Sequence, residues 1–123
     1  LRFVALQVVC GSRGPQMADL ELEVDGTLHN VQARGDGPVD ATFNAIKKLV
    51  PHQAVLALYQ VHAVTEGTDA QAMVTVRLVE NGKSVNGQGS DTDTLVASAR
   101  AYIHALNKLL TKRERTAPAA LSA

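Results

Sequence analysis

The chain has 123 residues, enough for one domain with a real core but about half of the roughly 250 residues of a (β/α)₈ barrel. Twelve basic and twelve acidic residues cancel to zero formal charge, which disfavours a nucleic-acid or anionic-membrane partner. The single cysteine, Cys10, excludes a disulfide framework, and no apolar run is long enough to cross a bilayer. We therefore expect a cytoplasmic domain. Because the chain opens inside a predicted strand, we also expect it to be cut from a longer protein.

The first half is predicted to form three strands and a helix. An apolar, β-branched run is followed by a segment in which apolar and acidic residues alternate, which is typical of a half-solvated antiparallel strand. Asp25-Gly26 is a strong hairpin signal. Apolar residues then recur at helical spacing after Pro38, which suits a first helical turn. The predicted elements are strands over 2–10, 19–25 and 27–34 and a helix over 38–50.

The second half is predicted to repeat this order. Asn81-Gly82 matches the first hairpin signal, and Ser90-Asp91-Thr92-Asp93 is rich in helix-capping residues. The predicted strands cover 54–66, 69–80 and 83–89, and the predicted helix covers 94–110. Residues 112–123 are charged and then rich in Ala, Pro and Ser, so we expect a flexible C-terminal tail.

Sliding the chain against itself by 56 residues, without a gap, aligns the two halves. Most aligned identities are turn glycines or residues of buried type, and these are the positions that a shared backbone constrains. The fold predicted is α+β, with two pseudo-symmetric βββα repeats (1–51 and 54–111) and an antiparallel sheet layer with helices on one side. An unclosed six-stranded sheet favours a homodimer, and the seam between halves suits a ligand. The matches include Val8/Val64, Gly11/Gly67, Met17/Met73, Leu22/Leu78, Gly26/Gly82, Asn30/Asn86 and the conservative pair Phe3/Tyr59.

The strongest local feature is the segment Gly35-Asp36-Gly37-Pro38-Val39-Asp40-Ala41. Glycines permit close backbone approach, and a helix start exposes N–H groups that suit a small anion such as a carboxylate. The alternative is a strand-to-helix turn with good capping. Gly67-Thr68-Asp69 could similarly hold an amino group or form a hairpin corner.

No other group of residues predicts catalysis. Asp91 and Asp93 suggest a metal site only weakly, because two carboxylates at a helix start are more often caps. The histidines have neither metal-ligand spacing nor the order of a catalytic triad: His29, His52, His62 and His104. We therefore predict no catalytic residue and no metal site in this chain, and we do not expect it to be an enzyme by itself.

Three ordered motifs resemble one family over nearly the whole chain. They are GDGPVDATFNAI (35–46), LYQVHAVTEGTDAQAMVTVRL (58–78) and VNGQGSDTDTLVASARAYIHALNKL (85–109). All three resemble the C-terminal regulatory domain of 2-isopropylmalate synthase. The resemblance implies a catalytic barrel in the parent protein that joins acetyl-CoA to 2-oxoisovalerate with a divalent metal. It also implies that this domain binds leucine, the pathway end product, and thereby inhibits the barrel, with no cofactor of its own.

The resemblance also implies a set of ligand-binding residues. The loop and helix start would hold the polar groups of leucine, and a long strand with the turn after it would complete an apolar cup. The residues implied are Gly35, Asp36, Gly37, Val39, Asp40, Ala41, Leu56, Tyr59, Ala63 and Ala70. The implied partners are leucine or a similar branched-chain amino acid, a second copy of the chain, and the barrel of the parent chain.

Two alternatives stay open. Citramalate synthases carry a related domain, which would bind isoleucine, and the chain could instead be a purely structural dimerisation module without a ligand. A small stand-alone enzyme has little support, because no nucleophile–base pair or metal cluster stands out.

Overall fold

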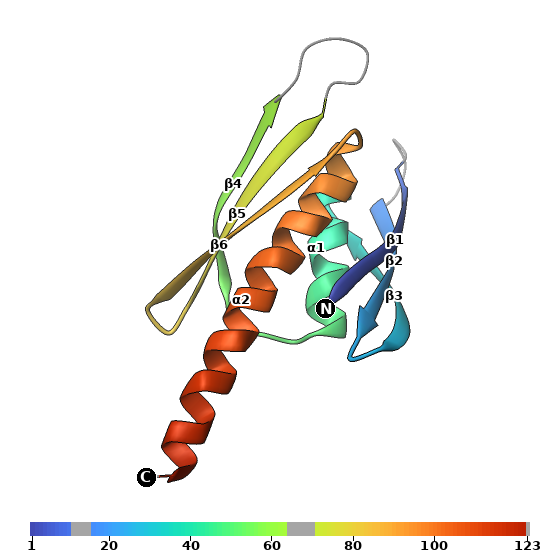
Figure 1. The fold of residues 1–123 in the computed structure, drawn as a ribbon. Coiled ribbons are helices and arrows are strands. Elements are labelled where there is room, and N and C mark those ends of the chain that lie inside the picture. Colours follow the sequence, from blue (N-terminus) through green and yellow to red (C-terminus); the bar gives the residue numbers. More distant parts are fainter. Residues whose placement is uncertain (11–15, 64–70, 123) are drawn as a thin grey trace.

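The computed structural model describes residues 1–10, 16–63 and 71–122. Two βββα units follow one another along the chain, as predicted (Figure 1). The predicted ends of the elements agree with the structure to within a few residues, except that the last helix extends to Ser122 and does not end near residue 110 as expected. The elements are β1 (Arg2–Val9), β2 (Gln16–Val24), β3 (Thr27–Gly35), α1 (Pro38–Leu49), β4 (Val55–Ala63), β5 (Ala72–Glu80), β6 (Lys83–Asp91) and α2 (Thr94–Ser122).

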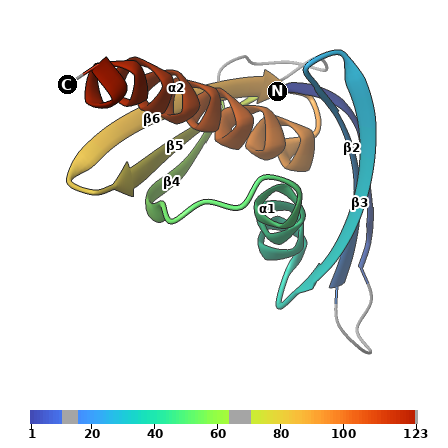
Figure 2. The ribbon, with the colours of Figure 1, turned by 90° about the horizontal axis from the view of Figure 1, so that it is seen from below.

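The described strands form two antiparallel sheets of three, in the orders β1-β2-β3 and β4-β5-β6, and not the single six-stranded sheet that we expected. Each helix packs on the sheet of its own unit: α1 on β2 and β3, and α2 on β5 and β6. The helices also touch each other, so both lie between the sheets (Figure 2). α2 continues past its sheet into residues 112–122 (Figure 1), and the flexibility expected there stays a prediction.

Alternation along the central strands builds the core. Leu20 and Leu22 of β2 are fully buried, whereas Glu21 between them is not. Val74, Val76 and Leu78 repeat the pattern in β5. Both hairpin predictions are also confirmed, because the Asp-Gly and Asn-Gly pairs have the positive φ angles of tight two-residue turns: 50° and 82° at Asp25 and Gly26, and 52° and 77° at Asn81 and Gly82.

The gapless shift of 56 residues holds for every element except the first strand of each unit. Tyr59 pairs with Val76, whose counterpart at that shift is Leu20, and Leu20 pairs with Leu6. Tyr59 therefore corresponds to Leu6, and the match of Tyr59 with Phe3 was wrong. The first strands align at a shift of 53 residues because the segment from β4 to β5 is longer than that from β1 to β2.

α2 lies so close to β6 that the strand has no room for side chains at two positions. A Cβ atom on Gly87 would lie 2.2 Å from the Ala101 carbonyl oxygen, and one on Gly89 would lie 2.4 Å from that of Ala97. Both glycines face fully buried alanines of the helix. The backbones of strand and helix are therefore in direct contact, which only glycine permits.

The outer edges of β3 and β6 are blocked by side chains of the helix that follows. Lys48 of α1 donates from Nζ to the Gln32 carbonyl oxygen at 3.0 Å, and Asn44 donates to that of Arg34 at 2.9 Å. In the second unit, His104 Nδ1 accepts from the Gln88 N–H at 3.0 Å. Unpaired strand groups that would otherwise recruit another chain are thus occupied at these positions.

Candidate functional site

The 35–41 loop (residues 35–41) is a compact unit. A Cβ atom on Gly35 would lie 2.4 Å from the Ala41 nitrogen, so the strand end rests directly against the helix start. The Asp40 carboxylate reaches back and accepts from the Asp36 N–H at 2.9 Å, and the Ala41 N–H closes the first helical turn on the Gly37 carbonyl oxygen at 2.9 Å. These hydrogen bonds hold the strand end and the helix start together, and a role of these residues in ligand binding stays a prediction.

The start of α1 has no side-chain cap. Gly37 occupies the N-cap with an extended backbone, φ −153° and ψ 173°, and Pro38 follows it. Since proline has no N–H, the Val39 and Asp40 N–H groups are the first that the helix presents outward. Nothing lies within 4 Å of the point where a Gly37 Cβ would stand. The helix start thus combines free donors, partial positive charge and open space, the features that a carboxylate requires.

Leu56 and Tyr59 lie on β4, on the face turned toward the helices. A register shift between Leu56 and Leu58 puts these two residues, three apart in sequence, opposite the buried Leu78 and Val76. Leu56 is still 41% exposed. Ala63 is the last residue of β4, and Ala70 lies outside the described residues.

Tyr59 is connected to both helices. Its ring meets Phe43 of α1 edge-on, with centroids 5.7 Å apart, and its hydroxyl lies 2.6 Å from Ser98 Oγ of α2. The structure therefore links the predicted residues of the 35–41 loop to Tyr59 through α1. No comparable contact joins Leu56 to the loop within the described chain.

Aromatic rings continue this connection into the segment between the units. Phe43 packs on Tyr102 of α2 at 4.6 Å between centroids, and the Tyr102 hydroxyl lies 2.8 Å from His52 Nε2. His52 Nδ1 accepts from the Ala54 N–H, so in the neutral ring Nε2 carries the proton and donates to Tyr102. Burial raises the pKa of Tyr102 to about 12, which keeps this hydroxyl neutral. Three of the four aromatic side chains thus meet where the units join.

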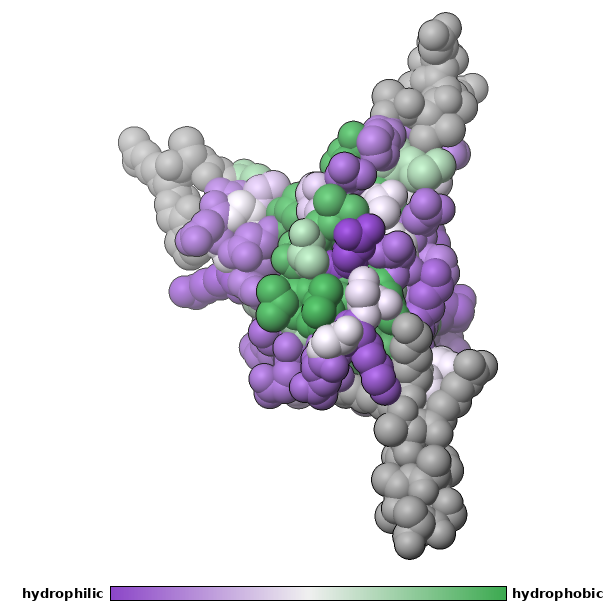
Figure 3. Space-filling model, turned by 90° about the vertical axis from the view of Figure 1, so that its left-hand side faces the viewer, coloured by the Kyte–Doolittle hydropathy of each residue, from purple (hydrophilic) through white to green (hydrophobic). Residues whose placement is uncertain are grey.

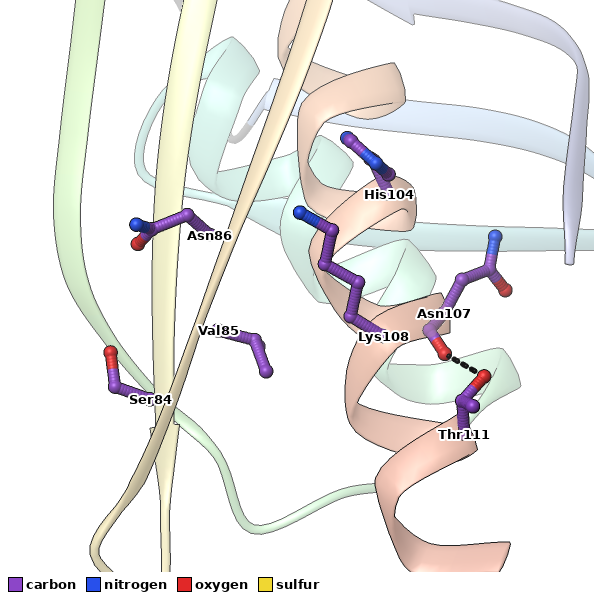
Figure 4. Close-up of a pocket in the computed structure, with 7 residues that line it drawn as sticks. All are labelled: Ser84, Val85, Asn86, His104, Asn107, Lys108 and Thr111. Atoms are coloured by element: carbon purple, nitrogen blue, oxygen red, sulfur yellow. Dashed lines mark hydrogen bonds between the residues drawn. The ribbon is translucent and has the colours of Figure 1, made fainter. Parts of the chain in front are cut away.

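A separate cavity of about 470 Å³ lies between β6 and α2, away from the predicted residues (Figure 4). Val85 points toward the helix, whereas Ser84 and Asn86 lie on the opposite side of the strand. His104 and Lys108 border it from α2, and both are exposed. A space lined by exposed polar side chains is a surface groove, and it does not have the features of the predicted ligand site.

Within residues 1–10, 16–63 and 71–122, no group of three or more His, Cys, Asp or Glu residues could hold a metal ion. In the same part of the chain, no helix is both long and apolar enough to cross a membrane.

Sequence reasoning missed Ser98. The residue is fully buried in the second turn of α2, where its hydroxyl donates to the Thr94 carbonyl oxygen at 2.7 Å. A serine in a helix often makes this local bond, so no sequence signal distinguishes one that also receives a tyrosine hydroxyl from a distant strand.

The comparisons with known proteins agree on one family. The model of the "LeuA allosteric (dimerisation) domain" matches residues 1–110. A 2-isopropylmalate synthase of Afipia carboxidovorans is 59% identical over 120 residues, and one of Rhodopseudomonas palustris (strain BisA53) is 60% identical over 122 residues. Each alignment covers 98% of this chain but only 23% of the relative. The chain therefore belongs to the family of LeuA allosteric (dimerisation) domains.

Proposed function

We propose that the chain is the allosteric regulatory domain of a 2-isopropylmalate synthase and that it binds leucine as a feedback inhibitor. The observation that carries this proposal is the uncapped start of α1 at the strongest sequence motif. The leucine carboxylate would accept hydrogen bonds from the Val39 and Asp40 N–H groups. Because an ionised carboxylate interacts favourably with a helix N-terminus, the α-carboxylate of an amino acid fits better than an uncharged ligand.

The apolar part of the ligand would lie toward β4. Val39 packs on the core beside the helix start, and Tyr59 is connected to the same helix through Phe43. Leu56 offers exposed apolar surface on the same face of β4. In this arrangement the Asp36 carboxylate or a loop carbonyl would receive the ammonium group, because the Asp40 carboxylate already accepts from Asp36 N–H.

We further propose that β4 joins the chain to a second copy of itself. Val55, Leu56 and Val61, all on this one strand, are 66%, 41% and 47% exposed. β4 lies on the side of the molecule shown in Figure 3, where apolar side chains gather in the middle of the face. An edge strand with several exposed apolar side chains is a typical surface for association, and it would place Leu56 and Tyr59 close to the interface.

The parent chain would supply the catalysis. The chain spans about a quarter of the length of its relatives, and we propose that the remaining length holds a cytoplasmic barrel with a divalent metal and acyltransferase activity toward acetyl-CoA and 2-oxoisovalerate. Binding of leucine here would inhibit that barrel. No catalytic role is proposed for any residue of this chain.

Calorimetric titration of the chain with leucine, isoleucine and valine tests this function. We expect leucine to bind and to raise the melting temperature, since any ligand of the native state stabilises it. Leucine should bind about tenfold more tightly than valine, because one more methylene in an apolar cup contributes about 1–3 kcal/mol. Preference for isoleucine would favour a citramalate synthase as the parent. Absence of binding at millimolar concentration of all three would favour a purely structural dimerisation module.

A further inference from the structure

The hydrogen bonds around Ser98 fix the direction of each proton. The Ser98 hydroxyl has a single proton, and it is donated to the Thr94 carbonyl oxygen at 2.7 Å. The Tyr59 hydroxyl, 2.6 Å from Ser98 Oγ, is therefore the donor in the second bond. Ser98 is fully buried, so no solvent molecule replaces it as the acceptor.

Two contacts hold the Tyr59 ring. Ser98 fixes its hydroxyl end from α2, and Phe43 packs against the ring from α1 at 68° between ring planes. Tyr59 itself is half-buried, so one side of the ring stays available. A half-exposed tyrosine without these contacts would sample several rotamers, and ordering it would reduce the affinity for any ligand that packs on it.

We propose that Ser98 is a positioning residue of the amino-acid site, which it serves by holding the Tyr59 ring as a fixed wall of the apolar cup. This inference rests on the proposed function, since it assumes that the ligand packs on Tyr59. It adds that α2, which contributes no residue to the predicted site, determines how deep the cup is. A fixed wall distinguishes leucine from the shorter valine, whereas a mobile ring adapts to both.

The experiment is a double-mutant cycle on the full chain, with leucine and valine affinities measured by calorimetry. Ser98→Ala and Tyr59→Phe each remove the bond between the two hydroxyls, and each should lower leucine affinity by roughly three- to tenfold, the usual worth of such a bond. The preference for leucine over valine should fall in both variants. In the Tyr59→Phe background, Ser98→Ala should have no further effect, because its partner is already gone.

Thr111→Ala is the matched control. Its hydroxyl donates to the Asn107 carbonyl oxygen of α2 at 2.9 Å, the same local bond that Ser98 makes, but far from Tyr59 in the chain. Its leucine affinity should equal that of the wild type. If Ser98→Ala does not fold, Tyr59→Phe tests the proposal by itself. It removes the same hydrogen bond, but the substitution is at a half-buried residue.

Three results would overturn the proposal. Unchanged leucine affinity in folded Ser98→Ala or Tyr59→Phe would show that the bond does not position the ring, while leaving leucine binding itself intact. An equal loss on adding Ser98→Ala to Tyr59→Phe would assign Ser98 a general structural role. Absence of leucine binding in the wild type would remove the proposed function and this inference together.

Discussion

The helix starts of the two units are equivalent in position but differ in capping: a carboxylate side chain caps α2, and no side chain caps α1. Gly37 and Asp93 occupy equivalent positions, one at each N-cap. The Asp93 carboxylate accepts from the Leu95 N–H at 2.8 Å and the Val96 N–H at 3.4 Å, whereas α1 has no side-chain cap. Leu95 and Val96 are the counterparts of Val39 and Asp40, whose N–H groups we assign to the ligand. The second unit thus carries, as part of its own chain, a carboxylate at the place where the first would bind one.

This difference explains why a repeated fold would have one site and not two. Duplication supplies two equivalent helix starts, each favourable to an anion. The side chain of Asp93 caps one of them, and Gly37 leaves the other without a side-chain cap, where we propose that the ligand binds. The difference therefore predicts one amino acid bound per chain.

The two units also differ in packing. Gly87 and Gly89 bring β6 into backbone contact with α2, but the equivalent positions of β3 hold Val31 and Ala33. The first strands, β1 and β4, differ in the opposite sense, because the one in the second unit is the less buried. Val8 of β1 packs against the core, whereas its structural counterpart in β4, Val61, is 47% exposed. The second unit has the tighter helix–strand contact and the more open first strand.

The largest effect is expected from alanine at position 87. Gly87→Ala forces β6 away from backbone atoms of α2 and should lower the free energy of unfolding by about 3 kcal/mol. Val31→Ala places the same residue at the equivalent position of the first unit, where it removes atoms from a half-buried site and should cost about 1 kcal/mol. Urea denaturation of both variants measures the difference. Equal losses would mean that the two helix–strand contacts are equally tight.

A charge on the first strand of each unit should separate association from folding. Val61→Glu puts a carboxylate on the proposed interface and should raise the dissociation constant of the dimer by roughly a hundredfold, or about 2–3 kcal/mol. The fold should be retained, because Val61 is exposed in the single chain. Val8→Glu should instead destabilise the fold. Sedimentation velocity and thermal melting distinguish these outcomes, and a Val61→Glu protein that still dimerises normally would place the interface elsewhere.

The smallest expected effect comes from giving the first unit the cap of the second. Gly37 already has an extended backbone and open space around its Cβ position, so Gly37→Asp should fold. Its carboxylate should cap α1, raise stability by up to about 1 kcal/mol and lower leucine affinity at least about tenfold. Asp93→Ala should cost about 1 kcal/mol without changing leucine affinity. Normal leucine binding by Gly37→Asp would place the ligand away from this helix start.

Local signals were sufficient to predict the elements. The Asp25-Gly26 and Asn81-Gly82 turns, the alternation in β2 and the start of α1 were all predicted from the sequence, because each depends on residues close together in the chain. The 35–41 loop was predicted as a ligand site from local signals of the same kind, and that role stays a prediction. At Gly35 the structure shows why glycine is needed: a Cβ atom there would collide with the start of α1.

Features that depend on contacts across the fold were not predicted. The pairing of Tyr59 with Val76 follows from the length of the segment that connects β4 to β5. Because Tyr59 and Phe3 are similar residues, the sequence comparison did not reveal the three-residue difference. The separation of the strands into two sheets depends on how the helices dock between them. In the sequence, Ser98 does not differ from any other helix serine, because its bond to Tyr59 forms only in the folded chain.

The blocked strand edges have a consequence for biosynthesis. Gln32 and Gln88 lie on strands that leave the ribosome before the helices that cover them, and the blocking side chains, Lys48 and His104, each follow 16 residues later. At about 5–20 residues per second, translation supplies those residues within roughly one to three seconds. Each open edge, the part of a nascent sheet most prone to pair with another chain, is therefore exposed only briefly before the next element synthesised can close it.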